Sequence, residues 1–99
     1  MLEIRMGDNG EIVLSGRLDA SQAGKAESFL DGVADSRVID LKGLEYISSA
    51  GLGALMKTQK RLLKSGKGLV IRNASKHIYD IFHFSGLDRV CEIEKPFQP

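Results

Sequence analysis

The stretch Asp40-Leu-Lys-Gly-Leu-Glu-Tyr-Ile-Ser-Ser-Ala-Gly-Leu-Gly-Ala-Leu55 decides the fold, because it joins a predicted strand to a predicted helix. The β-branched run at 38–41 predicts a short strand that is apolar enough to be buried on both faces. A predicted turn then leads to two adjacent serines, Ser48 and Ser49. Apolar residues at helical spacing follow directly, so a helix is expected over about 51–64.

The two serines stand where the unpaired N–H groups of a helix begin. A serine in this position is most often a simple N-cap, which stabilises the helix by about 1 kcal/mol. A phosphate would also be held there, because the positive end of the helix dipole favours an anion. Extending the helical spacing back by one turn brings Ser49 toward the exposed stripe and Ser48 toward the buried one. Both interpretations, cap and phosphorylation switch, stay open.

Small residues follow the serines, at Ala50, Gly51 and Gly53, so the backbone of another protein could approach closely. Each glycine inside a helix costs roughly 1 kcal/mol relative to alanine. The expected buried stripe of this helix is Leu52, Leu55, Met56, Gln59, Leu62 and Leu63. The opposite stripe is Gly53, Lys57, Lys60, Arg61 and Lys64. Such basic residues are usually a solvated face that suits the C-terminal end of the helix dipole.

Strand and helix signals alternate along the rest of the chain. Further strands are expected at 2–6, 11–15, 69–72 and 90–93, with a hairpin turn at 7–10. One further helix, capped by Asp19 or Ser21, should bury Ala26, Phe29, Leu30 and Val33. Another, capped by Ser75, should bury Ile78, Ile81 and Phe82. A left-handed glycine cap should end the central helix at 65–68, and 96–99 should be a loose tail.

Composition fits one ordinary globular domain. The chain has 99 residues, of which 42% are hydrophobic and 27% charged. A formal charge of +1 gives no basis for binding nucleic acid or for a polybasic membrane anchor. The single cysteine, Cys91, suits a reducing compartment and should be buried. Residues 1–6 do not resemble a signal peptide, and no apolar run could span a bilayer. A cytoplasmic protein is expected.

Other chemistries are not supported by the motifs present. His77 and His83 are six residues apart and have no accompanying ligand cluster, so no metal site is predicted. The glycines of 51–53 and 66–68 fit neither a dinucleotide fingerprint nor a phosphate-binding loop. A small hydrolase using Ser48 or Ser49 would need a neighbouring base, and none is evident. We therefore predict no catalytic residue and no cofactor.

The stretch 40–52, Asp-Leu-x-x-Leu-x-Tyr-Ile-Ser-Ser-Ala-Gly-Leu, resembles the central motif of STAS domains of the bacterial anti-sigma factor antagonist type. Residues 16–20 are similar to the Gly-x-Leu-Asp turn of that family, 66–71 to its glycine-rich turn into a strand, and 85–87 to its closing Gly-Leu. These landmarks span nearly the whole chain in the expected order. One departure is Ser48, which stands where many members carry aspartate.

The resemblance implies a single STAS domain over 1–99, of α/β class. Its sheet should be mixed and mostly parallel, with an N-terminal hairpin and about three to four helices. It implies an anti-sigma factor antagonist, not an enzyme. The unphosphorylated form would bind a serine-kinase anti-sigma factor and free the sigma factor.

The resemblance also assigns roles to residues. The kinase would use ATP to phosphorylate Ser49, with Ser48 as the second candidate, and a PP2C-type phosphatase would reset the switch. The residues expected to contact the partner are Asp19, Ser21, Ser48, Ala50, Gly51, Gly53 and Lys57. The alternative is a STAS subunit that is not switched and serves as a scaffold or as the soluble component of a lipid or anion transport system.

Overall fold

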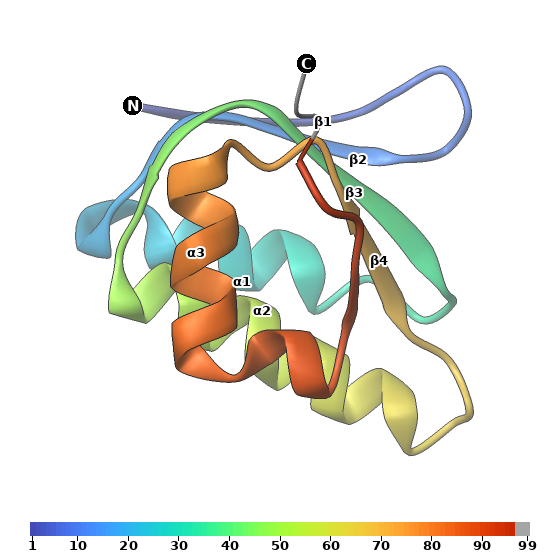
Figure 1. Cartoon of the computed structure of the whole chain (residues 1–99). Helices are drawn as coiled ribbons and strands as arrows, with labels where there is room; N and C mark the ends of the chain where they lie inside the picture. Colours follow the sequence, from blue (N-terminus) through green and yellow to red (C-terminus); the bar gives the residue numbers. More distant parts are fainter. Residues whose placement is uncertain (97–99) are drawn as a thin grey trace.

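The computed structural model describes residues 1–96, in which strands and helices alternate after an initial hairpin (Figure 1). The strands are β1 (Leu2–Met6), β2 (Ile12–Leu18), β3 (Arg37–Ile47), β4 (Leu69–Arg72) and β5 (Glu92–Ile93). The helices are α1 (Ala23–Leu30), α2 (Ser49–Leu63) and α3 (Lys76–Ser85), with short 3-10 turns η1 (Ala20–Gln22) and η2 (Leu87–Arg89). The predicted α/β class, with a mixed sheet and an N-terminal hairpin, is confirmed.

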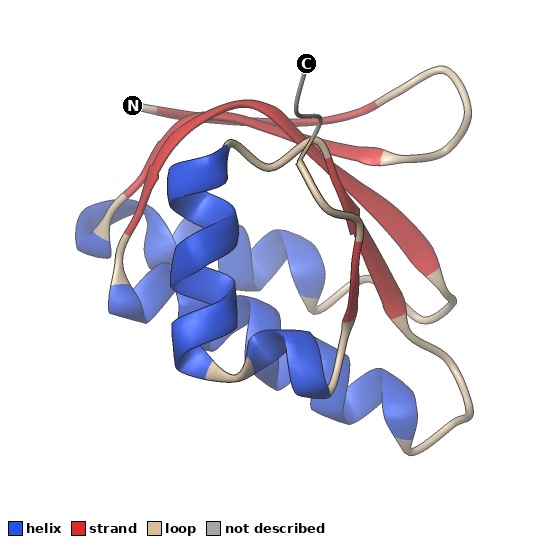
Figure 2. Ribbon diagram, viewed as in Figure 1, coloured by secondary structure: helices blue, strands red, loops and turns tan. Residues whose placement is uncertain are grey.

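The five described strands lie in the order β1-β2-β3-β4-β5. The pair β1–β2 is antiparallel and the other three pairs are parallel. Each parallel pair is joined through a helix, and the helices all cover the same face of the sheet (Figure 2). The prediction that the strand at 38–41 is buried on both faces is therefore wrong. Ile39 and Leu41 are buried, whereas Val38 and Asp40 point to the open face and are only half-buried.

The turn expected before the serines is also wrong, because β3 continues to Ile47. The pairing of β2 with β3 shifts twice, and at each shift β3 contains one residue more than β2. The buried residues of β3 are consequently Ile39, Leu41, Leu44 and Ile47. Their spacing lengthens from two to three residues. The alternation of buried and exposed residues that is typical of a strand is therefore missing from the second half of β3. Such bulges bend a strand, and β3 arches over the helices (Figure 1).

Neither Asp19 nor Ser21 caps α1 as predicted. The chain forms the 3-10 turn η1 first, and α1 begins at Ala23, with no side-chain capping hydrogen bond at either start. The backbone N–H of Gln22 instead donates to the carbonyl oxygen of Asp19 at 3.0 Å. Val33 lies beyond the end of α1 but is still buried.

The buried face of α2 is rotated relative to the prediction. Its buried residues are Gly51, Ala54, Leu55, Thr58, Gln59 and Leu62. Leu63 was expected inside, yet 49% of its surface is exposed. The rotation follows from packing, because α2 contacts α1 and also the sheet, where Gln59 accepts a hydrogen bond from Leu69 of β4 and Gly51 lies against Leu18 of β2. Phe29, Leu52 and Ile81 are likewise only partly buried, at the edge of the core.

The strands β1 and β4 have the predicted bounds, whereas β2, expected at 11–15, continues to Leu18. Gly66 has φ +72° and ends α2 in the left-handed conformation, as expected. Ser75 accepts a hydrogen bond from the N–H of Ile78 at 3.2 Å and caps α3. The last strand begins at Glu92 instead of Val90. Cys91 is buried, and burial raises the pKa of its thiol to about 11. The predicted tail lies outside the described residues except for Pro96.

Candidate functional site

The two serines lie where β2 and β3 end side by side. Leu18 and Ile47 are paired as the last residues of these parallel strands. The backbone N–H of Ser48 then donates to the carbonyl oxygen of Leu18 at 2.8 Å. Asp19 follows Leu18 and Ser49 follows Ser48, so both chain segments leave the sheet together at its carboxyl edge. In α/β sheets this edge is the usual position of binding sites.

Ser48 is the N-cap of α2. Its backbone is extended, with φ −86° and ψ 169°, and its Oγ accepts a hydrogen bond from the N–H of Gly51 at 3.1 Å. The cap interpretation is thus confirmed for this serine. Asp and Ser are both strong N-cap residues. Replacing the usual aspartate by Ser48 therefore keeps the acceptor and removes one negative charge.

Ser49 is the first residue of α2 and is exposed, whereas Ser48 is half-buried. None of the side-chain hydrogen bonds within residues 1–96 uses the hydroxyl of Ser49, whereas Ser48 supplies the cap. Ala50, which follows, is exposed as well. The structure therefore leaves one of the two hydroxyls accessible to another protein and uses the other internally.

Asp19 and Ser21 form the rim of the same edge. The hydroxyl of Ser21 donates to Oδ1 of Asp19 at 2.7 Å, and this hydrogen bond lowers the pKa of Asp19. Asp19 is half-buried and Ser21 exposed. A fixed, ionised carboxylate therefore lies at the end of β2, beside the loop that carries the serines.

Gly51 and Gly53 have opposite surroundings. Gly51 is buried, and a Cβ there would lie 2.5 Å from Cγ and 3.0 Å from the carbonyl oxygen of Leu18. Glycine at this position lets α2 begin directly against the end of β2. Gly51 is thus covered by Leu18 and, contrary to the prediction, is not exposed to a partner. Gly53 is exposed, and within residues 1–96 no group lies within 4 Å of its Cβ position.

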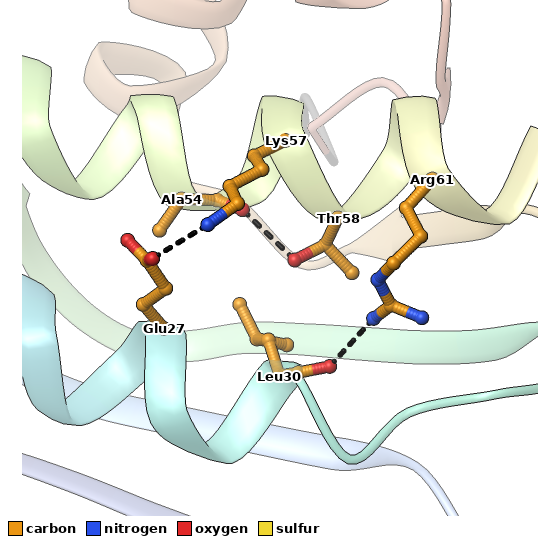
Figure 3. A network of polar contacts seen from close by, with 6 residues as sticks. All are labelled: Glu27, Leu30, Ala54, Lys57, Thr58 and Arg61. Carbon is orange, nitrogen blue, oxygen red and sulfur yellow. Dashed lines mark hydrogen bonds and ion pairs between the residues drawn. The ribbon is translucent and has the colours of Figure 1, made fainter.

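The basic stripe of α2 is partly tied to α1 (Figure 3). Nζ of Lys57 lies 2.7 Å from Oε1 of Glu27, and this hydrogen bond raises the pKa of Lys57. The guanidinium of Arg61 donates to the carbonyl oxygens of Leu30, at 2.9 Å, and Val33, at 2.8 Å. It thereby ties α2 to the last residue of α1 and to the segment that follows it, where the carbonyl oxygen of Leu30 also accepts from the N–H of Val33 at 2.9 Å. This role of Arg61 could not be predicted from the sequence pattern, since its partners are 28 and 31 residues away.

Within residues 1–96, no group of three or more His, Cys, Asp or Glu side chains is placed to hold a metal ion. Nδ1 of His83 lies 2.7 Å from Oδ2 of Asp88, a pairing that the sequence spacing of His77 and His83 did not suggest. Over the same residues, none of the helices is both long and apolar enough to cross a bilayer.

Comparison with known proteins identifies the family. The family model described as "Mlab, STAS domain" matches residues 3–94. The anti-sigma-B factor antagonist of Listeria monocytogenes serovar 1/2a is 31% identical over 91 residues, which cover 88% of this chain and 80% of that protein. An anti-sigma factor antagonist from Mycobacterium paratuberculosis has a similar structure, with a TM-score of 0.79 at 24% identity over 98% of this chain and 86% of the other.

The Bacillus cell fate determinant SpoIIAA in its phosphorylated form has the same fold. Its TM-score is 0.68 at 18% identity, over 96% of this chain and 92% of that one. The landmarks quoted from the sequence therefore belong to one continuous match, in which the carboxyl edge with its two serines is included. The chain belongs to the STAS domain family, among relatives that are anti-sigma factor antagonists.

Proposed function

We propose that this protein is an anti-sigma factor antagonist that acts as a switch. Its unphosphorylated form binds a serine-kinase anti-sigma factor in the cytoplasm and so frees the sigma factor. The kinase then uses ATP to phosphorylate Ser49, which ends the interaction, and a PP2C-type phosphatase restores the active form. The observation that carries this proposal is the exposed hydroxyl of Ser49 at the start of α2, in a chain related to anti-sigma factor antagonists.

The structural difference between the serines supports the choice of Ser49. A kinase needs a hydroxyl that can enter its active site, and Ser49 is exposed. The Oγ of Ser48 accepts the capping hydrogen bond from Gly51. Phosphorylating Ser48 would disturb a cap worth about 1 kcal/mol. Phosphorylating Ser49 leaves that hydrogen bond in place.

Electrostatics explains why the phosphate would act on binding and not on folding. It adds about −1.5 to −2 charges at pH 7. At the first residue of α2 the helix dipole favours such a charge. In an interface, an unpaired charge that loses its water costs several kcal/mol, which lowers affinity by orders of magnitude. The surface concerned comprises Asp19, Ser21, Ser48, Ser49, Ala50, Gly53 and Lys57.

Phosphopeptide mapping tests the assignment. The purified protein is incubated with ATP and the anti-sigma kinase of the same organism, alongside the variants Ser49→Ala and Ser48→Ala. We expect phosphate on Ser49 alone in the wild type, none in Ser49→Ala, and continued labelling of Ser48→Ala. Phosphate on Ser48, or undiminished labelling of Ser49→Ala, would overturn the assignment.

A second candidate function is a STAS subunit that is not switched, serving as a scaffold or as the soluble component of a lipid or anion transport system. The substitution of Ser48 for the usual aspartate favours it, because the site then has one carboxylate fewer than many members of the family. This candidate predicts that Ser49→Asp leaves the affinity for the protein's partner unchanged.

A further inference from the structure

We propose that the outer face of α2 is a docking strip for an acidic segment of the partner. This inference rests on the proposed function, in which the partner is the anti-sigma kinase, and adds the chemistry of the surface that the kinase presents. The docking strip is a hollow of about 510 Å³ on the outer surface of α2. It is lined by Gly53, Met56, Lys57, Lys60, Arg61 and Lys64.

The docking strip begins one helical turn after the exposed serine. Ser49 and Gly53 are four residues apart in α2, so they lie on the same face. From Gly53 to Lys64 the strip extends for about 16 Å along the helix axis, which is the length of roughly three turns. A partner that covers Ser49 can therefore continue along the strip without changing direction.

The lining of the docking strip has four basic side chains and no carboxylate. Lys57 is paired with Glu27, and Arg61 is held by carbonyl oxygens of α1. Among the residues that the structure describes, Lys60 and Lys64 belong to none of the ion pairs. The formal charge of the whole chain is only +1, so this positive surface is local. Carboxylates of a partner are its natural complement.

Gly53 supplies the floor of the docking strip. An exposed glycine inside a helix costs roughly 1 kcal/mol relative to alanine. Glycine at position 51 is explained by its contact with Leu18, whereas none of residues 1–96 places a packing partner within 4 Å of the Cβ position of Gly53. The cost is understood if a partner side chain approaches the backbone there. With the half-buried residue Met56 beside it, the floor suits an apolar side chain flanked by acidic residues.

The neighbouring charges favour a protein segment over an anionic membrane. The carboxylate of Glu27 lies beside Lys57, and Asp31 is close enough to influence the pKa of Lys57. A broad anionic surface would meet these carboxylates together with the lysines, whereas a single acidic segment can follow α2 alone. The same chemistry links the docking strip to the switch, since a phosphate on Ser49 repels an acidic partner.

Charge reversal tests the proposal. The dissociation constant for the anti-sigma kinase of the same organism is measured by calorimetry for the wild type, Lys60→Glu and the matched control Lys42→Glu. Lys42 is also exposed but lies on β3, away from the docking strip. We expect Lys60→Glu to weaken binding about tenfold and Lys42→Glu to change it by less than about twofold. The difference should shrink at high salt.

Gly53→Gln separates docking from folding. The new side chain fills the floor of the docking strip and suits a helix better than glycine. We expect a higher melting temperature together with an affinity about tenfold weaker. Gly53→Gln with unchanged affinity, or equal losses in Lys60→Glu and Lys42→Glu, would overturn the docking strip while wild-type binding upholds the proposed function.

Two further outcomes are decisive. If the wild type does not bind the kinase at all, both the proposed function and the docking strip are refuted. If the protein instead sediments with vesicles of phosphatidylglycerol and phosphatidylcholine, and Lys60→Glu abolishes this, the strip serves an anionic lipid surface and the acidic protein segment is refuted.

Discussion

The inner and outer faces of α2 each contain a glycine, and the two glycines have different consequences. On the inner face, Gly51 touches Leu18 at the end of β2, and the residues around it are buried against the sheet and α1. On the outer face, Gly53 has open space above it, between Ser49 and the lysines of the docking strip. The inner face is explained by packing alone. The outer face contains residues that packing does not require, which is expected of a binding surface.

The largest effect is expected on the inner face, at Leu55, which is completely buried. Leu55→Ala should lower the free energy of unfolding by about 2–5 kcal/mol, because it removes apolar contacts and leaves a cavity. Leu63→Ala is the matched control, since 49% of Leu63 is exposed, and it should cost less than about 1 kcal/mol. Chemical denaturation measures both. A loss below about 0.5 kcal/mol for Leu55→Ala would mean that the faces of α2 are assigned backwards.

The next effect concerns Gln59, a buried polar residue on the same face. Its Oε1 accepts from the N–H of Leu69 at 2.7 Å, and its Nε2 donates to the carbonyl oxygen of Val90 at 2.6 Å. Gln59→Leu leaves both backbone groups without their partner, so we expect a loss of about 2–4 kcal/mol. Chemical denaturation measures this loss, and hydrogen exchange measures how well the N–H of Leu69 is protected. Exchange at Leu69 that stays as slow as in the wild type would contradict this account.

The two glycines should respond to alanine with opposite signs. Gly51→Ala brings a methyl group against Leu18 and should destabilise the protein by about 1–3 kcal/mol. Gly53→Ala meets no obstacle and should stabilise it by up to about 1 kcal/mol. Thermal melting of the two variants measures the contrast directly. Melting temperatures that move in the same direction would remove the distinction between the faces.

Sequence reasoning located the junction between β3 and α2 because that junction is local. The N-cap Ser48, the exposed Ser49 and the first apolar residues of α2 all lie within about one helical turn, and over such short distances sequence patterns are informative. The N-terminal hairpin and the cap at Ser75 were predicted for the same reason. The exposure of Ser49 relative to Ser48 also followed from spacing alone.

Features that depend on contacts between distant residues could not be predicted from such local patterns. The two bulges of β3 arise from its pairing with β2. Because of them, the sequence pattern at 42–47, the last six residues of β3, predicts a turn instead of a strand. The rotation of α2 that exposes Leu63 depends on the position of α1. Gly51 and Gly53 look alike in the sequence, and only Leu18 distinguishes them.

The central claim, that a negative charge at Ser49 acts on binding and not on folding, is tested most directly by Ser49→Asp. Its affinity for the anti-sigma kinase and its melting temperature are compared with those of Ser49→Asn, which has nearly the same shape without the charge. We expect Ser49→Asp to bind about a hundredfold more weakly than Ser49→Asn, with melting temperatures within a few degrees, because the helix dipole accommodates the charge. Equal affinities for the kinase would contradict the claim and favour a STAS subunit that is not switched.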